Sequence, residues 1–126
     1  VPPPAVTEAL RLVCVHVLEP VRAHFGRPVT VNSGYRSQAV NRAVKGSSTS
    51  QHVRGEAVDF EVPGVSNGDV AAWVRFNLQF DQLILEAYTP GNPSSGWVHC
   101  SWKPSGRRMS VLTFVPGKGY FNGLSV

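Results

Sequence analysis

The chain has 126 residues, of which 42% are hydrophobic and 16% charged, and its formal net charge is +4. This composition is typical of one folded domain over residues 1–126 and excludes a disordered chain, and no apolar run approaches the ~18 residues of a membrane span. The basic residues are scattered without a dense stripe, which argues against nucleic-acid binding, although a basic surface suits an anionic polymer.

The N-terminal part predicts a helix over residues 4–25, because apolar side chains recur at helical spacing. Gly26 and the proline after it end this helix, and Pro20 is expected to kink it or split it in two. Its histidines, His16 and His24, belong to no motif, which predicts surface or packing roles.

Residues 29–31 predict a short strand that leads into a Gly-containing loop, and Ser37 caps a helix through Val44. Arg36 lies on this loop, where a guanidinium can bind a carboxylate through two hydrogen bonds; a structural salt bridge is the alternative. Residues 45–50 are small and polar and predict a loop at the rim of a site.

The stretch from residue 50 to residue 59 brings two metal-ligating residue types close in sequence, His52 and Asp59. On one strand they would lie about 23 Å apart, and on one helix roughly 10 Å. One ion with bonds near ~2 Å requires the backbone to fold back, and Gly55 can take the necessary angles. We expect His52 at the end of a loop and Asp59 in a strand over residues 56–62.

A turn at Pro63 is followed by a helix that Ser66 caps and whose Trp73 face packs on the sheet. Residues 116–126 are expected to form a surface tail. Further strands are predicted over residues 82–87, 97–102 and 109–115.

A catalytic zinc usually has three protein ligands, and the best third candidate is His99. Strand alternation places Trp97, His99 and Ser101 on one face and Cys100 on the other. Cys100 and Cys14 are therefore expected to be small buried residues, not disulfide partners or metal ligands.

The pattern Ser-x-His-x-x-Gly-x-Ala-x-Asp, followed by Trp-x-His at residues 97–99, resembles the zinc D-Ala-D-Ala carboxypeptidase family. This family includes phage endolysins that cut L-alanyl-D-glutamate bonds, vancomycin-resistance dipeptidases and, more distantly, the hedgehog signalling domain. The resemblance covers residues 2–113. It implies an α+β fold in which two or three helices pack on a small, mostly antiparallel sheet. It also implies a zinc site in a cleft over the sheet, held by His52, Asp59 and His99.

Many relatives carry a catalytic carboxylate three residues before the last histidine ligand, where this chain has Gly96. We expect Glu86 to replace it as the general base. If residue 84 lies opposite His99 in an antiparallel hairpin, Glu86 shares a face with that histidine. The other acidic candidates are less well placed, because alternation turns the first away and the second lies at the far end of its strand: Glu56 and Asp81.

The resemblance implies a zinc metallopeptidase that hydrolyses peptidoglycan stem peptides, of the carboxypeptidase or endopeptidase type. Arg36 is expected to bind a substrate carboxylate or stabilise the oxyanion. Two alternatives stay open: a zinc-containing cell-wall-binding module without activity, favoured by Gly96, and a structural domain with a vestigial site. The remaining candidate substrate contacts are Tyr35, Ser50 and Gln51.

We expect a monomer that acts in the bacterial cell wall or periplasm and is either phage-encoded or exported. The sequence contains no signal-peptide pattern, so export would depend on something outside this chain. The opening, Val1 to Pro4, looks like a processed or truncated start.

Overall fold

The computed structural model describes residues 2–47 and 49–125, so Val1 in the predicted start and residue 48 in the predicted rim loop lie outside the described residues. The fold is built on a six-stranded sheet with the order β1-β2-β4-β3-β5-β6. All neighbouring strands are antiparallel except the parallel pair β3 and β5, which confirms a mostly antiparallel sheet. The strands are β1 (Thr30–Ser33), β2 (Ala57–Glu61), β3 (Gln82–Glu86), β4 (Trp97–Ser101), β5 (Ser110–Val115) and β6 (Gly119–Asn122).

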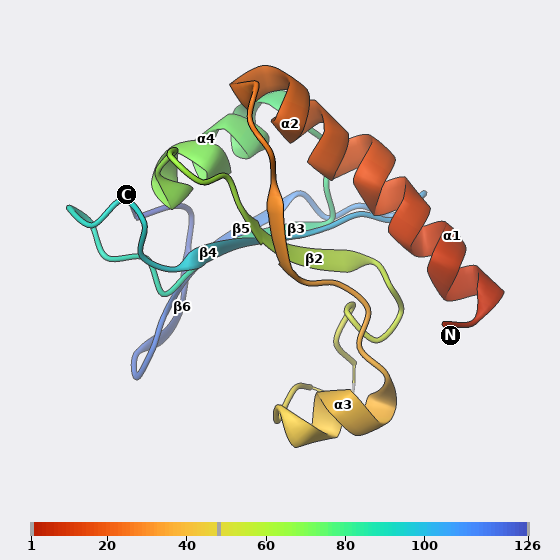
Figure 1. The fold of residues 1–126 in the computed structure, drawn as a ribbon. Coiled ribbons are helices and arrows are strands. Elements are labelled where there is room, and N and C mark those ends of the chain that lie inside the picture. The colour runs from red at the N-terminus through yellow and green to blue at the C-terminus, as the bar shows by residue number, and fades with distance from the viewer. Residues whose placement is uncertain (1, 48, 126) are drawn as a thin grey trace.

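The helices of residues 4–25 and 67–77 cover one face of this sheet, and the helix of residues 38–43 lies on the other side (Figure 1). The covered face carries the core, in which helix residues such as Val17 and Val74 pack with strand residues such as Phe60 and Leu85. None of the helices in the described part of the chain has the length and apolarity that a membrane crossing requires. The helices are α1 (Pro4–Val13), α2 (Glu19–Phe25), α3 (Gln38–Ala43) and α4 (Asn67–Asn77).

The predicted first helix continues without interruption through a π-helical segment, η1 (Cys14–Leu18), which joins α1 to α2. Pro20 lies in the first turn of α2 and has no N–H for the carbonyl four residues earlier. The N–H of Glu19 instead bonds to the carbonyl of Cys14, five residues back. The expected kink or split at Pro20 therefore takes the form of a local π-helical widening.

The two cysteines are free, and they occupy different environments. Cys100 is buried in the core, as predicted. The same prediction is wrong for Cys14, which is exposed because its neighbours Val13 and Val17 occupy the buried side of the helix.

The histidines of the first helix pack on tryptophan rings. Of the two roles predicted for them, surface or packing, the structure confirms packing. His16 stacks on Trp102 with ring centroids 3.9 Å apart, and His24 stacks on Trp73 at 4.4 Å. Both contacts join the helical layer to other elements and leave these imidazoles outside the site described below.

The predicted C-terminal tail is instead a strand, β6, which pairs with β5 in an antiparallel hairpin. The chain reverses over Val115 to Lys118, where the N–H of Lys118 donates to the carbonyl of Val115 at 2.9 Å. Gly117 has φ +79° at the third turn position, after a proline at the second. This is the residue pattern of a type II turn.

Candidate metal centre

His52 lies in a turn that folds the chain back before β2. The N–H of Glu56 donates to the carbonyl of Gln51 at 2.9 Å, and Gly55 has φ +72°. A Cβ at Gly55 would lie 2.8 Å from the carbonyl oxygen of Val6 in α1, so only glycine fits here. The turn is therefore fixed both by backbone conformation and by packing.

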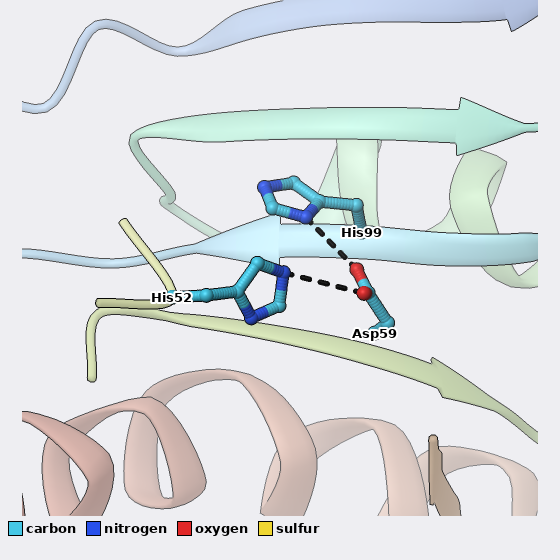
Figure 2. A group of neighbouring side chains, drawn as sticks. All are labelled: His52, Asp59 and His99. Atoms are coloured by element: carbon cyan, nitrogen blue, oxygen red, sulfur yellow. Dashed lines mark hydrogen bonds and ion pairs between the residues drawn. The ribbon is translucent and has the colours of Figure 1, made fainter. Parts of the chain in front are cut away.

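Three side chains from this turn and from two adjacent strands converge on one point (Figure 2). Asp59 of β2 lies directly opposite His99 of β4. Nε2 of His52 is 3.2 Å from Oδ2 of Asp59, and Nδ1 of His99 is 2.9 Å from Oδ1. The ligand atoms of all three lie within 4.8 Å of one another.

The hydrogen bonds around His52 favour a cation between its Nε2 and the carboxylate of Asp59. Its Nδ1 lies 2.8 Å from the carbonyl oxygen of Gly34, which can only accept a hydrogen bond, so Nδ1 carries a proton. A neutral His52 then turns the lone pair of Nε2 towards the carboxylate of Asp59. Two acceptors 3.2 Å apart repel each other unless a proton or a metal ion lies between them.

The ionised form of Asp59 is also suited to binding a cation. Burial by itself would raise the pKa of Asp59, but its contacts with His52 and His99 outweigh burial and lower the pKa to about 2. Zinc bonds of ~2.0–2.1 Å place neighbouring tetrahedral ligand atoms roughly 3.3 Å apart, and the three ligand atoms here lie within 4.8 Å of one another. The donor set, two imidazoles and an ionised carboxylate brought close together, therefore fits a zinc ion.

Glu86 lies beside these three residues in the predicted register. Ile84 pairs with His99, which confirms the predicted hairpin alignment, and Glu86 pairs with Trp97. The indole N–H of Trp97 donates to the Glu86 carboxylate at 3.0 Å, and that carboxylate lies 4.0 Å from Nδ1 of His99. Burial is the main reason that the pKa of Glu86 is raised.

The hairpin also explains why position 96 has no carboxylate. Gly96 has φ +68°, and a Cβ there would overlap the carbonyl oxygen of Glu86 and lie 2.7 Å from the carbonyl carbon of Ala87. No side chain fits at residue 96 in this hairpin. Among the residues of β3 and β4, the carboxylate is supplied by Glu86.

Two hydrogen bonds connect Arg36 to the turn that carries His52, which we call the ligand turn. Its backbone N–H donates to the carbonyl of His52 at 3.0 Å, and its Nη2 donates to the hydroxyl of Ser50 at 3.2 Å. The same hydroxyl accepts the backbone N–H of His52. Within the described ranges the guanidinium has no carboxylate partner, and its Nε is buried without an acceptor. Arg36 thus retains hydrogen-bonding capacity for another molecule.

These residues line a single pocket of about 760 Å³. Ser50 and Gln51 are part of its wall, whereas Tyr35 is not among the residues that line it. Glu56 is also outside it and pairs with Arg54 at 3.0 Å. Lys45 comes from the predicted rim loop, whereas three other lining residues belong to no predicted part of the site: Lys103, Arg108 and Tyr120.

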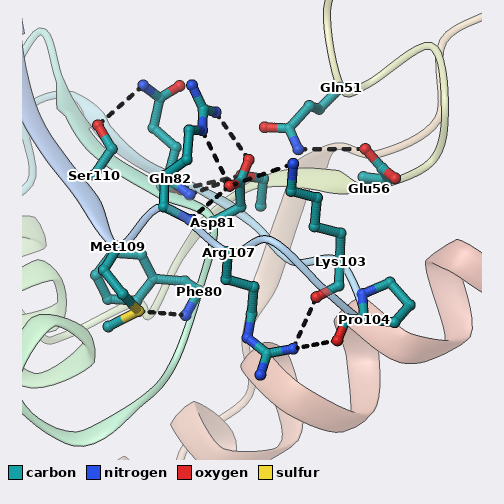
Figure 3. Close-up of polar contacts among 12 residues, drawn as sticks. Gln51, Glu56, Phe80, Asp81, Gln82, Lys103, Pro104, Arg107, Met109 and Ser110 are labelled. Carbon is teal, nitrogen blue, oxygen red and sulfur yellow. Dashed lines mark hydrogen bonds and ion pairs between the residues drawn. The ribbon is translucent and has the colours of Figure 1, made fainter.

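Asp81 lines the pocket but is already engaged with cations (Figure 3). Its side chain is 1% exposed and accepts two hydrogen bonds from the Arg108 guanidinium, at 3.0 and 2.8 Å. Lys103 lies 3.8 Å away. Burial alone would raise the pKa of Asp81, but the Arg108 bonds hold it at about 2. This carboxylate therefore fastens the start of β3 to the segment before β5.

Residues 4–101 match the family described as Peptidase M15. No curated protein matches the chain. Because the match covers most of the chain, the protein belongs to the peptidase M15 family of zinc D-Ala-D-Ala carboxypeptidases and endopeptidases, which confirms the resemblance seen in the sequence.

Proposed function

From this family membership, we propose that the protein is a zinc-dependent peptidase that hydrolyses peptide bonds in peptidoglycan stem peptides. The convergence of His52, Asp59 and His99 beside the buried carboxylate of Glu86 carries the proposal. These three residues would hold the zinc in a cleft over the sheet. When bound, zinc supplies a water of lowered pKa and polarises the scissile carbonyl.

Glu86 is the proposed general base. It accepts a proton from the attacking water and delivers it to the leaving amine nitrogen, and its raised pKa suits both transfers. The indole N–H of Trp97 holds the carboxylate in place. Glu86 therefore takes the role that a carboxylate at residue 96 would otherwise fill.

Arg36 and its neighbours are the proposed substrate contacts. Arg36 lines the pocket, and the terminal nitrogens of its guanidinium can donate to a substrate carboxylate or to the oxyanion. Ser50 and Gln51 lie in the pocket wall near it, and Tyr35 remains a predicted contact on the preceding loop. Five cationic and three acidic side chains line the pocket, which suits an acidic peptide.

The test is to incubate zinc-loaded protein with bacterial sacculi, with and without a chelator. New peptide termini, identified by mass spectrometry, should appear only with metal, and their identity shows which bond is cut. Glu86→Gln is the matched control, since it keeps the three ligands and should release nothing above background. Binding without release would support a binding module instead, and neither binding nor release would support a structural domain.

The cellular setting follows from the substrate. We propose that the protein acts as a monomer in the bacterial cell wall or periplasm, where stem peptides occur. Size-exclusion chromatography with light scattering tests the monomer, and a dimer under assay conditions would contradict it.

A further inference from the structure

The sheet face that carries the metal centre extends past Glu86 to the C-terminal hairpin. Four residues pair in succession across β4, β3, β5 and β6, and paired residues share a face. The row consists of Trp97, Glu86, Phe114 and Tyr120. Two strand spacings separate the backbones of Glu86 and Tyr120, about 10 Å. The pocket wall therefore reaches the outer strand of the sheet.

Tyr120 presents an oriented side chain on this wall. Its ring packs on that of Phe114, with centroids 4.7 Å apart and planes at 48°. It lines the pocket and is 58% exposed. Its hydroxyl makes no hydrogen bond to the part of the chain that the structure describes. The ring is thus held by Phe114 while Tyr120 forms part of the pocket wall.

The hydroxyl of Tyr120 is a hydrogen-bond donor at neutral pH. Partial burial and, secondly, the charge of Glu86 raise its pKa, so the phenol keeps its proton. Peptide carbonyls and carboxylates accept such a bond. The chemistry of this part of the wall therefore suits a peptide backbone or an acidic peptide group.

Arg36 and Tyr120 lie on opposite sides of the metal centre. Arg36 is attached to the ligand turn before β2, whereas Tyr120 belongs to β6, on the far side of β4 and β3. A substrate that touches both must extend to each side of the scissile bond. The family match ends at Ser101, before the hairpin that carries Tyr120.

We propose that Tyr120 is a substrate-binding residue that selects peptides continuing on both sides of the scissile bond. Its ring packs against the substrate, and its hydroxyl donates to a substrate carbonyl or carboxylate. This inference rests on the proposed peptidase function and adds to it a preference for longer peptides over dipeptides.

The test compares zinc-loaded wild-type protein with Tyr120→Ala, Tyr120→Phe and the control Phe121→Ala. Phe121 is the next residue of β6, is 47% exposed and does not line the pocket. On a stem pentapeptide, Tyr120→Ala should raise KM about tenfold with little change in kcat, and Tyr120→Phe should raise it roughly threefold, the effect of one lost hydrogen bond. Phe121→Ala should match the wild type.

Peptide length provides the second comparison. A D-Ala-D-Ala dipeptide spans only about 7 Å and has no residues beyond the scissile bond to place along the hairpin wall, so its KM should change less than that of the pentapeptide. An unchanged KM for the pentapeptide in Tyr120→Ala, or an equal loss in Phe121→Ala, would overturn the inference. An equal loss for the dipeptide would also overturn it, because it would indicate a structural role.

Binding measurements separate this inference from the proposed function. Titration calorimetry of the pentapeptide against zinc-loaded Glu86→Gln, with and without Tyr120→Ala, needs no turnover. An approximately tenfold weaker Kd in the double variant supports the role of Tyr120 even if the wild-type protein proves inactive. Equal Kd values in an otherwise active enzyme overturn that role and leave the peptidase function intact.

Discussion

The two sides of the pocket are built differently. On the metal side, His52 is 3% exposed and its turn is pressed against Val6 of α1. On the hairpin side, Tyr120 is 58% exposed, and the turn at Gly117 has open space around it. A metal ion demands fixed ligand positions, whereas a substrate wall must admit and release a peptide. We infer from this contrast that the chemistry belongs to the tightly packed side and that the open side adds a substrate contact to that of Arg36.

The largest expected effect comes from removing a ligand on the packed side. Asp59→Ala deletes the carboxylate that bridges His52 and His99, so zinc and hydrolysis should both fall to background. Elemental analysis of purified protein measures the zinc. Asp69→Ala, in the first turn of α4, is the control and should keep both. Near-stoichiometric zinc in Asp59→Ala would show that the ligands lie elsewhere.

The next largest effect is expected for the base. Glu86→Gln keeps an oxygen that can accept the indole N–H of Trp97, so fold and zinc content should be preserved. Turnover should fall by ~10²–10⁴-fold, the usual effect of losing a general base. Steady-state kinetics with a zinc assay on the same sample measures both. Wild-type turnover in this variant would assign the base to another group.

Asp81 tests the link between the two sides, because it joins the start of β3 to the segment before β5. Its folded-state pKa, about 2, lies below the ordinary value of 3.8. Its contribution of about 2 kcal/mol is therefore fully present above pH ~4 and is lost as the pH falls towards 2. Asp81→Asn should remove this contribution at neutral pH.

Chemical denaturation between pH 2 and 7 measures the effect at Asp81. The control is Glu19→Gln, which breaks an exposed pair with Arg22 and should not change stability measurably. The difference between wild type and Asp81→Asn should shrink as the pH falls. A difference that is constant across this range would mean that the charge of Asp81 contributes nothing.

Arg36→Lys examines the substrate contact attached to the packed side. Lysine keeps the charge but loses the planar fork and the buried Nε. The expected result is an approximately tenfold lower kcat/KM with zinc retained, as for one lost charge-assisted hydrogen bond. Arg22→Lys, at an exposed residue of α2 that is paired with Glu19, is the matched control. Equal kinetics in wild type and Arg36→Lys would leave Arg36 a structural role only.

The packed side could be predicted from sequence because coordination chemistry permits few residue types. His52 and Asp59 come together with His99, the expected third ligand, and Ile84 lies opposite His99 in the register on which the choice of Glu86 depended. Gly96 looked like a loss of function in the sequence. The structure shows instead that a backbone contact across the hairpin excludes a side chain there. Such a contact leaves no pattern in the sequence.

The hairpin side could not be predicted in the same way. Tyr120 belongs to no motif, because a substrate wall can be built from many residue types. A local signal was nevertheless present: Pro116 and Gly117 follow a strand and are the residues of a type II turn, which predicts a hairpin and not a tail. The pairing of Asp81 with Arg108 spans 27 residues, and no periodicity indicates it.

The smallest expected effect compares one glycine on each side. Gly55 and Gly117 both have positive φ, so alanine is strained at either position. At Gly117 no atom lies within 4 Å of the added Cβ, and Gly117→Ala should cost only about 1 kcal/mol. At Gly55 the added Cβ also meets the backbone of Val6, so Gly55→Ala should cost more and weaken zinc binding. Urea denaturation of the zinc-free proteins gives the two costs. Equal costs would show that the hairpin turn is held as tightly as the turn that carries His52. The two sides of the pocket would then not differ in packing, and packing could not explain why only one side carries the chemistry.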